Sequence, residues 1–287
     1  MRTVCNILGV IIALTHLFPA QAATVSILPN KPYECTGEQC YASDFQLFGK
    51  ITSSTPQELT KLMDDLRRQA KQEGKQLFFK GARLWLSSQG GLLDAAYDIG
   101  RLLRRERMTA GIASEQECDS SCVFILAGAV DRLIFGRVGI HQPYLVNVPS
   151  SENIEKVRKS YQATLLNMKS YLREMNTPEG LAEQILKIPA SNVRYLTKAE
   201  LADYGLSRTD PVEQELRDIE DSRRYGTDRP EFLRRKLLAE TVCKRRLHDV
   251  SDYFTCLDYV QDYGKEPPPY QIKPKPDLST LGTPVQR

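Results

Sequence analysis

The sequence predicts an α/β fold, because short apolar strands alternate with amphipathic helices between Phe45 and Phe135. Residues 45–51 alternate in polarity, as a half-buried strand does, and residues 82–88 form an apolar strand that holds the single tryptophan, Trp85. Each of these strands is followed by a stretch in which apolar residues recur at helical spacing. This order is typical of a layer of strands covered by helices.

The first predicted helix has Thr55 as its cap, Pro56 in its first turn and Glu58 in place to close a capping box. The apolar face of this helix consists of Leu59, Leu62, Met63, Leu66 and Ala70. The elements expected next are a helix at 92–103, a strand at 109–113, an apolar helix at 122–129 and a strand at 132–135.

The flanking segments are of a different kind. Residues 24–43 contain two prolines and two cysteines, and we expect an irregular leader there. Beyond His141 the pattern is helical, at residues 153–175, 179–188 and 198–204. Residues 23–209 therefore form the main domain, residues 210–265 a charged helical appendage, and the proline-rich residues 266–287 a disordered tail.

The charge of the chain is nearly balanced. Its 287 residues carry 39 Lys and Arg against 36 Asp and Glu, a net charge of +3. This gives no reason to expect nucleic acid or an anionic membrane surface as a partner.

The N-terminus has the pattern of a secretory signal peptide. A positive start at Arg2 precedes an apolar run from Val4 to Leu17, and small residues at Ala20 and Ala22 match a cleavage site. The apolar run is too short to span a bilayer comfortably, and no later segment is suited to do so. We expect residues 1–22 to be removed and the mature protein to be periplasmic or secreted.

Cysteine usage agrees with export. The chain has seven cysteines, and without Cys5 an even number remains, as expected of an oxidised protein. They lie in local pairs: Cys35 and Cys40, Cys118 and Cys122, Cys243 and Cys256. Zinc is the alternative, but no histidine accompanies any pair at ligand spacing, so we expect disulfides and no metal. The local pairing is one of fifteen connectivities that six cysteines allow.

Three short segments carry residues suited to chemistry. Ser87–Gly91 joins a strand to a helix, and its two glycines allow backbone N–H groups to face a ligand oxygen. Cys118–Cys122 places serines at the start of the apolar helix, where the helix dipole favours developing negative charge. His141 follows a strand and is one of two histidines in the mature chain, so it is a candidate general base. Taken singly, the three segments are better explained as a tight turn, as N-caps formed by Asp119 and a serine, and as a capping or core histidine.

Taken in order, these motifs resemble the Clp peptidase and signal peptide peptidase branch of the crotonase-like (ClpP/crotonase) superfamily. The family's Ser-x-Gly-Gly turn corresponds to Ser88–Gly91, and its serine that opens an apolar helix corresponds to Ser120. Its Ile-His-Gln-Pro motif is present at residues 140–143, and a later Arg-Phe-Leu-Ser-x-x-Glu-Ala-x-x-Tyr-Gly-Leu segment is similar to residues 194–206. The resemblance covers about Phe45 to Leu206. It implies a crotonase-like (ClpP-like) spiral core built on a parallel sheet, with a helical C-terminal appendage.

The chain departs from the family at one site position. Clp peptidases have an acid immediately before the Arg-Phe pair, and this chain has Val193 there. Asn192 is the substitute that we consider, because an amide orients the histidine in cysteine proteases. The family's spacing to Phe124 selects Ser120 as nucleophile, with Ser121 as the alternative.

The resemblance implies a serine peptidase or esterase without cofactor or metal. Ser120 attacks a carbonyl, His141 takes and returns the proton, Asn192 orients the imidazole, and the N–H groups of Gly90 and Ser121 hold the oxyanion. A polypeptide or ester substrate and a homo-oligomer are consistent with this family, and an exported protein has no ATPase partner. The missing acid predicts weak or specialised activity. The alternative is a catalytically silent scaffold of the same fold that binds a periplasmic partner.

Overall fold

The computed structural model describes residues 22–28, 31–144, 154–244 and 250–268. The chain divides into two compact units, Met1–Pro211 and Val212–Arg287. The signal-peptide prediction concerns residues almost all of which lie outside the described ranges, as does most of the predicted tail.

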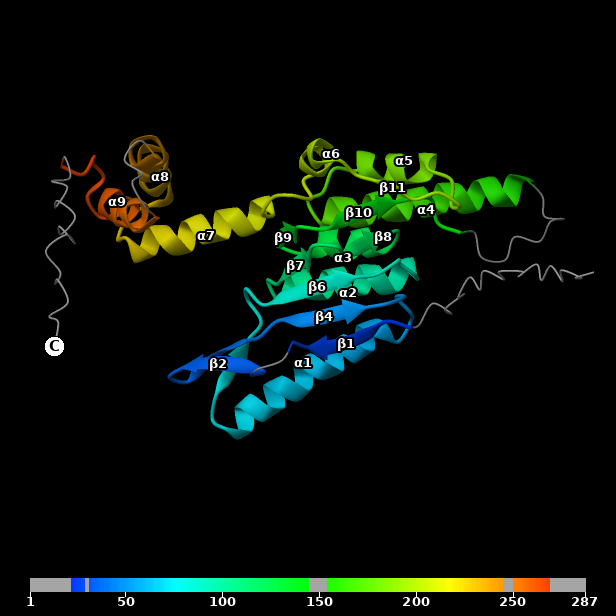
Figure 1. Ribbon diagram of the computed structural model, residues 1–287, viewed down its shortest axis with the longest axis horizontal. Helices are drawn as coiled ribbons and strands as arrows, with labels where there is room; N and C mark the ends of the chain where they lie inside the picture. The colour runs from blue at the N-terminus through cyan, green and yellow to red at the C-terminus, as the bar shows by residue number, and fades with distance from the viewer. Residues whose placement is uncertain (1–21, 29–30, 145–153, 245–249, 269–287) are drawn as a thin grey trace, which may run out of the picture. The chain divides into compact units, whose positions relative to one another are not determined.

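The first unit is built on a five-stranded sheet in the order β1-β4-β6-β7-β9 (Figure 1). The strands are β1 (Thr24–Ile27), β4 (Phe45–Phe48), β6 (Arg83–Ser87), β7 (Thr109–Ile112) and β9 (Asp131–Ile134). All neighbouring strands are parallel except β1, which pairs antiparallel with β4 at the edge. The structure therefore confirms an α/β fold with a parallel sheet.

A second, three-stranded sheet has the order β11-β10-β8. Its strands are β8 (Glu117–Asp119), β10 (Arg137–Ile140) and β11 (Arg194–Tyr195), with β10 parallel to β8 and antiparallel to β11. A parallel bridge between Ser88 and Cys118 links the end of β6 to this sheet. The carboxyl ends of β6, β8 and β10 thereby come together.

The irregular leader expected at residues 24–43 is wrong. This segment forms β1 and a hairpin of β2 (Tyr33–Thr36) and β3 (Gln39–Ala42), which joins β5 (Gln76–Phe78) in a third sheet. Cys35 lies opposite Cys40 in the hairpin and is bonded to it, and Gly37 takes the positive φ of 65° that the turn requires. Most of the hairpin's residues are exposed, so its sequence carries no alternation of polar and apolar residues.

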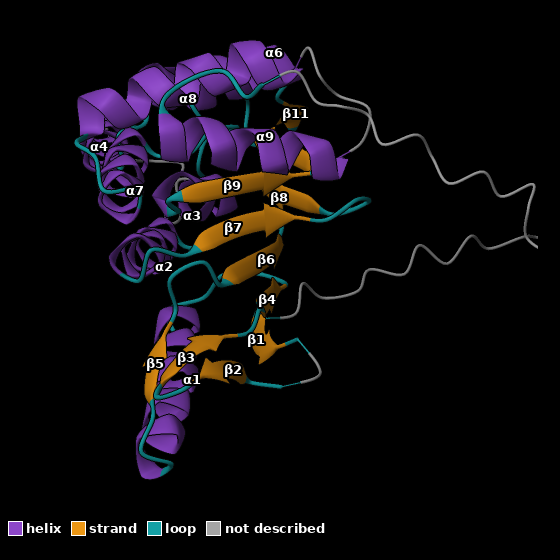
Figure 2. Ribbon diagram, turned by 90° about the vertical axis from the view of Figure 1, so that its left-hand side faces the viewer, coloured by secondary structure: helices purple, strands orange, loops and turns teal. Residues whose placement is uncertain are grey.

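Helices α1 (Thr55–Gln72) and α2 (Leu93–Arg105) lie along one side of the column of strands in Figure 2. The apolar face expected for α1 is buried apart from Leu62, which is half-buried. Ser54, and not Thr55, holds the cap position of α1, and the Thr55 hydroxyl accepts a hydrogen bond from the Thr52 amide.

Helix α3 (Cys122–Gly128) is wholly buried and packs closely against α2. A Cβ on Gly128 would lie 2.4 Å from the Cα of Gly100, so this approach requires glycine. Tyr171 of α4 (Ile154–Glu174) donates a hydrogen bond of 2.7 Å to the Phe124 carbonyl. The serine turn that precedes α3 is thus held by a rigid core.

The remaining helices of the first unit are α5 (Gly180–Lys187) and α6 (Lys198–Asp203), and α6 begins with a capping box formed by Thr197 and Glu200. Helix α7 (Pro211–Arg224) starts at the boundary between the units. The second unit also contains α8 (Arg229–Cys243) and α9 (Val250–Tyr263), which are joined by the Cys243–Cys256 disulfide. No helix within the described ranges is long and apolar enough to cross a membrane.

Candidate active site

A cavity of about 470 Å³ lies where the carboxyl ends of β6, β8 and β10 meet. Ser120, Ser121, His141 and Gly90 all contribute to its lining. Leu92, Leu93, Phe124 and Ile185 supply apolar wall, and Lys50 and Gln89 are polar. The structure therefore brings the predicted nucleophile, general base and oxyanion residues to one cavity.

The two glycines of the Ser87–Gly91 turn allow a very close approach of backbones. Gly90 has a φ of 92°, and a Cβ there would lie 2.6 Å from the Cβ of Ser120. A Cβ on Gly91 would lie 2.0 Å from the Ile51 carbonyl oxygen. The Gly90 carbonyl accepts a hydrogen bond of 2.9 Å from the Ile51 amide, which fixes the turn beside the serines.

Ser120 has a φ of 58°, which is uncommon for a residue other than glycine. Such backbone costs about 1–3 kcal/mol and is concentrated at functional sites. The Ser120 amide donates to the Gly139 carbonyl at 2.9 Å, and the Cys118–Cys122 disulfide closes the chain around the turn. The strained conformation of Ser120 is thereby held from both sides.

Ser121 is placed differently from its neighbour. It is 1% exposed, and among the described residues its Oγ has no hydrogen-bond partner. Ser121 stands at the cap position of α3, where the N–H groups of the first turn have no acceptor within the helix. Its amide is therefore suited to an oxyanion, whereas its hydroxyl is less accessible than that of Ser120, which is half-buried.

His141 is 7% exposed, and its Nδ1 lies 2.8 Å from the Gln142 carbonyl oxygen. A carbonyl only accepts, so this hydrogen bond places the proton of the neutral ring on Nδ1 and leaves Nε2 free to take one. A backbone group thus sets the tautomer that a general base needs.

The Gly90 amide already has an acceptor. It donates to Ser88 Oγ at 3.1 Å, and this hydroxyl donates in turn to the Gly49 carbonyl at 2.6 Å. The Gly90 N–H would have to exchange this acceptor for a substrate oxygen before it could stabilise an oxyanion.

Neither Asn192 nor Val193 lines the cavity, although Cγ1 of Val193 lies beside Gly139, two residues before His141. Asn192 is exposed, its Oδ1 accepts a hydrogen bond of 3.3 Å from Ser191, and it does not line the cavity. Val193 is 45% exposed.

Asp119, which the sequence suggests only as an N-cap, is a buried acid and not the cap of α3. It is 6% exposed, and burial raises the pKa of its carboxyl to about 6, opposed by a hydrogen bond from the Gly139 backbone. The local sequence carries no signal of this burial, because it depends on the pairing of β8 with β10.

Six cysteines are paired as expected, Cys35 with Cys40, Cys118 with Cys122 and Cys243 with Cys256. Within the described ranges no group of three or more His, Cys, Asp and Glu side chains is arranged to hold a metal ion.

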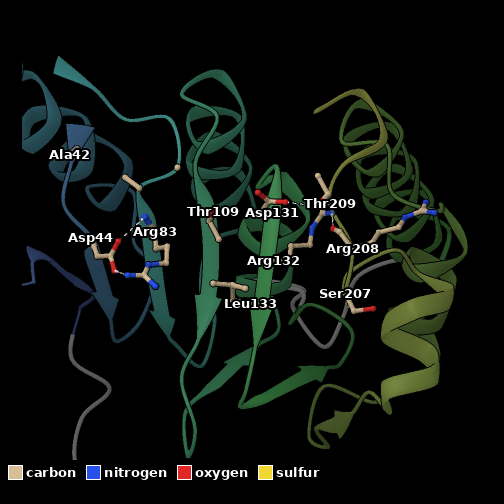
Figure 3. A pocket seen from close by; sticks show the side chains of 12 residues that line it. Ala42, Asp44, Arg83, Thr109, Asp131, Arg132, Leu133, Ser207, Arg208 and Thr209 are labelled. Atoms are coloured by element: carbon tan, nitrogen blue, oxygen red, sulfur yellow. Dashed lines mark hydrogen bonds and ion pairs between the residues drawn. The ribbon is translucent and has the colours of Figure 1, made fainter. Parts of the chain in front are cut away.

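A second cavity, of about 590 Å³, lies at the opposite edge of the main sheet, where β6, β7 and β9 begin (Figure 3). Its charged side chains pair with their neighbours: Arg83 with Asp44 at 2.6 Å, and Asp131 with the Thr209 hydroxyl at 2.6 Å. Ligands of parallel sheets bind outside the carboxyl ends of the strands, which favours the cavity with Ser120 and His141.

No protein-family model matches the chain, and no curated protein sequence matches it. Among solved structures the chain is similar to one variant of the 1510-N membrane-bound stomatin-specific protease, with a TM-score of 0.40 and 21% identity over 56% of this chain and 75% of that one. A second variant of that protease, in complex with a substrate peptide, has a TM-score of 0.39 and 18% identity over 58% and 72% of the two chains. A variant of ClpP1 from Listeria monocytogenes has a TM-score of 0.39 and 16% identity over 59% and 88%.

Proposed function

We propose that this chain is an exported serine hydrolase of the ClpP-like type that cleaves peptide or ester bonds. The observation that carries the proposal is the convergence of Ser120, His141 and Gly90 on one cavity. The order of motifs along the chain supports it independently, because the same residues occupy the family's nucleophile, base and oxyanion positions.

In the first half of the reaction Ser120 Oγ attacks the substrate carbonyl, and its proton passes to Nε2 of His141. The hydrogen bond from Nδ1 to the Gln142 carbonyl keeps Nε2 available as the acceptor. The new oxyanion accepts hydrogen bonds from the Ser121 amide and, after it releases Ser88 Oγ, from the Gly90 amide. Loss of one such donor typically lowers the rate by about 10²–10³.

In the second half His141 returns the proton to the departing amine or alcohol, which leaves an acyl group on Ser120. Water then gives a proton to His141 and attacks the acyl carbon. His141 returns this proton to Ser120 Oγ as the bond from Oγ to the acyl carbon breaks, which regenerates the serine and releases the acid product.

Ser120 is the better nucleophile of the two serines. Its positive φ of 58° is the strained backbone expected at a reacting residue, and it is half-buried. Ser121 is almost fully buried and begins the helix, so its contribution is its amide.

The test is covalent labelling of the purified mature protein with a fluorophosphonate probe. We expect labelling that is abolished by Ser120→Ala, strongly slowed by His141→Gln and retained in Ser121→Ala. Ser114→Ala, at an exposed turn outside the cavity, is the matched control and should label as the unmodified protein does. Peptide mapping of the adduct identifies the modified serine.

Two results would overturn the proposal. Labelling that persists in Ser120→Ala and disappears in Ser121→Ala would move the nucleophile to Ser121. No labelling of a folded mature protein would favour the silent scaffold, which is consistent with the valine at the family's acid position.

A further inference from the structure

We propose that Asp119 is a positioning residue for His141, which supplies from β8 the acidic group that position 193 lacks. The proposal rests on the proposed serine hydrolase function, because its role is to stabilise the imidazolium formed when His141 takes the proton of Ser120.

The first support is the shared face of the β11-β10-β8 sheet. Asp119 lies opposite Gly139 in the parallel pairing of β8 with β10. A Cβ built on Gly139 would lie 2.2 Å from Asp119 Oδ1 and 2.6 Å from Cγ1 of Val193. The side chains of residues 119 and 193 therefore meet over Gly139. Since alternate residues of an extended chain point the same way, His141 follows Gly139 on this face.

Arg137 and Glu117 are the next pair along β10 and β8 on the same face, and their charges balance each other. Arg137 pairs with Glu117, its guanidinium lies 4.4 Å from the Tyr195 ring centre, and the Tyr195 hydroxyl donates to Glu117 at 3.0 Å. Because Glu117 and Arg137 neutralise each other, the carboxyl of Asp119 is the uncompensated acid in the row that leads to His141.

The second support is that the buried carboxyl of Asp119 has little to compensate its charge beyond the hydrogen bond from the Gly139 backbone. Oδ1 of Asp119 is buried without a hydrogen-bond partner among the described residues. Asp119 forms no ion pair within those residues, and the cap position of α3 belongs to Ser121. A buried carboxyl with one oxygen unsatisfied and no ion pair is costly, and such costs are retained where they serve function.

The third support is the space that Gly139 leaves. Any larger residue at position 139 would displace the Asp119 carboxyl, because its Cβ would lie closer to Oδ1 of Asp119 than van der Waals contact allows. The glycine and the aspartate therefore form a matched pair. In this arrangement the Gln142 carbonyl sets the tautomer of His141, and Asp119 supplies the negative charge.

The experiment compares three variants with the unmodified protein. The first is Asp119→Asn, the second combines Asp119→Asn with Val193→Asp, and the third, the matched control, combines Asp119→Asn with Val193→Asn. Two readouts are measured in the full mature protein: the NMR titration midpoint of His141, assigned with His141→Gln, and the fluorophosphonate labelling rate. Asp119→Asn should lower the midpoint, because it removes a negative charge from the face on which His141 lies. It should also slow labelling at least tenfold at pH 8.

Val193→Asp in the Asp119→Asn background should restore much of the His141 midpoint and of the labelling rate, because it returns an acid to the same face. Val193→Asn in that background should restore neither the midpoint nor the rate. An unchanged His141 midpoint in Asp119→Asn overturns the proposal. If the unmodified protein does not react with the probe, the proposed hydrolase function fails, and the midpoint still decides whether Asp119 acts on His141.

Discussion

The amide of Ser120 donates a hydrogen bond of 2.9 Å to the carbonyl of Gly139, two residues before His141. The turn that carries the candidate nucleophile is therefore fixed to the strand that leads to the candidate base. The pairing of β8 with β10 therefore helps to set how the two residues approach each other. Changes to β8 or β10 are for this reason expected to affect chemistry as well as stability.

The buried carboxyl of Asp119 predicts a pH-dependent stability. Its pKa is raised from 3.8 in the unfolded chain to about 6 in the folded one, so between these values the folded state binds more protons. Stability from this group is complete below about pH 4 and is lost as the pH rises through 6, by about 3 kcal/mol in total. We expect Asp119→Asn to raise the free energy of unfolding at pH 7.5 and to leave it nearly unchanged at pH 4.

Urea denaturation at several pH values measures this difference. Asp203→Asn, at an exposed site, is the control and should show little effect at either pH. A variant at 119 that is destabilised at pH 7.5 would contradict the prediction. A gain in stability with a loss of labelling is the trade-off expected of a functional residue.

The close packing of α2 against α3 predicts a severe effect of Gly128→Ala. The added methyl would lie 2.4 Å from the Cα of Gly100, so the two helices must separate. Overpacking of this kind typically costs about 1–3 kcal/mol of stability. We expect a loss at or above the upper end of this range, because the contact is with backbone atoms, which cannot adopt another rotamer as a side chain can. Thermal unfolding measures it. Gly180→Ala, where a Cβ meets nothing within 4 Å, is the matched control and should be neutral or slightly stabilising.

The parts of the fold that the sequence predicts well are those with local signals. Helices α1 and α2 have regular apolar spacing, and the apolar run of α3 is buried throughout, as expected. The β2-β3 hairpin lacks such a signal because its side chains are exposed. Asp119 was missed for another reason. Its environment depends on the pairing of β8 with β10 and on Val193, contacts between residues far apart in the sequence.

The buried guanidinium of Arg132 predicts a large cost of removal. It donates to the carbonyls of Leu126, Ala127, Gly205 and Arg208, at 3.0, 2.6, 3.2 and 2.9 Å. The first two carbonyls belong to the last turn of α3, where they lack helical donors. Burial lowers the pKa of Arg132 to about 10, so it stays charged at neutral pH.

We expect Arg132→Met to lower the free energy of unfolding by about 3 kcal/mol or more. Methionine fills much of the space of the arginine, but it leaves the buried carbonyls without hydrogen-bond donors. Chemical denaturation checks this value. Arg105→Met, 65% exposed at the side chain, should change stability by less than about 0.5 kcal/mol. Equal effects of the two substitutions would show that the four carbonyls find other partners.

The Cys118–Cys122 disulfide closes the turn that holds Ser120, with only four residues of separation between its cysteines. A loop this short constrains the unfolded chain less than a long loop does, so its loss should cost little global stability. Its local effect should be larger, because the strained φ of Ser120 persists only while the surrounding structure holds it.

We therefore expect Cys118→Ala with Cys122→Ala to slow fluorophosphonate labelling at least tenfold while the protein stays folded. Cys243→Ala with Cys256→Ala removes a disulfide from the second unit and should leave the labelling rate unchanged. Equal labelling in all three proteins would show that the backbone of the serine turn keeps its conformation without the bond.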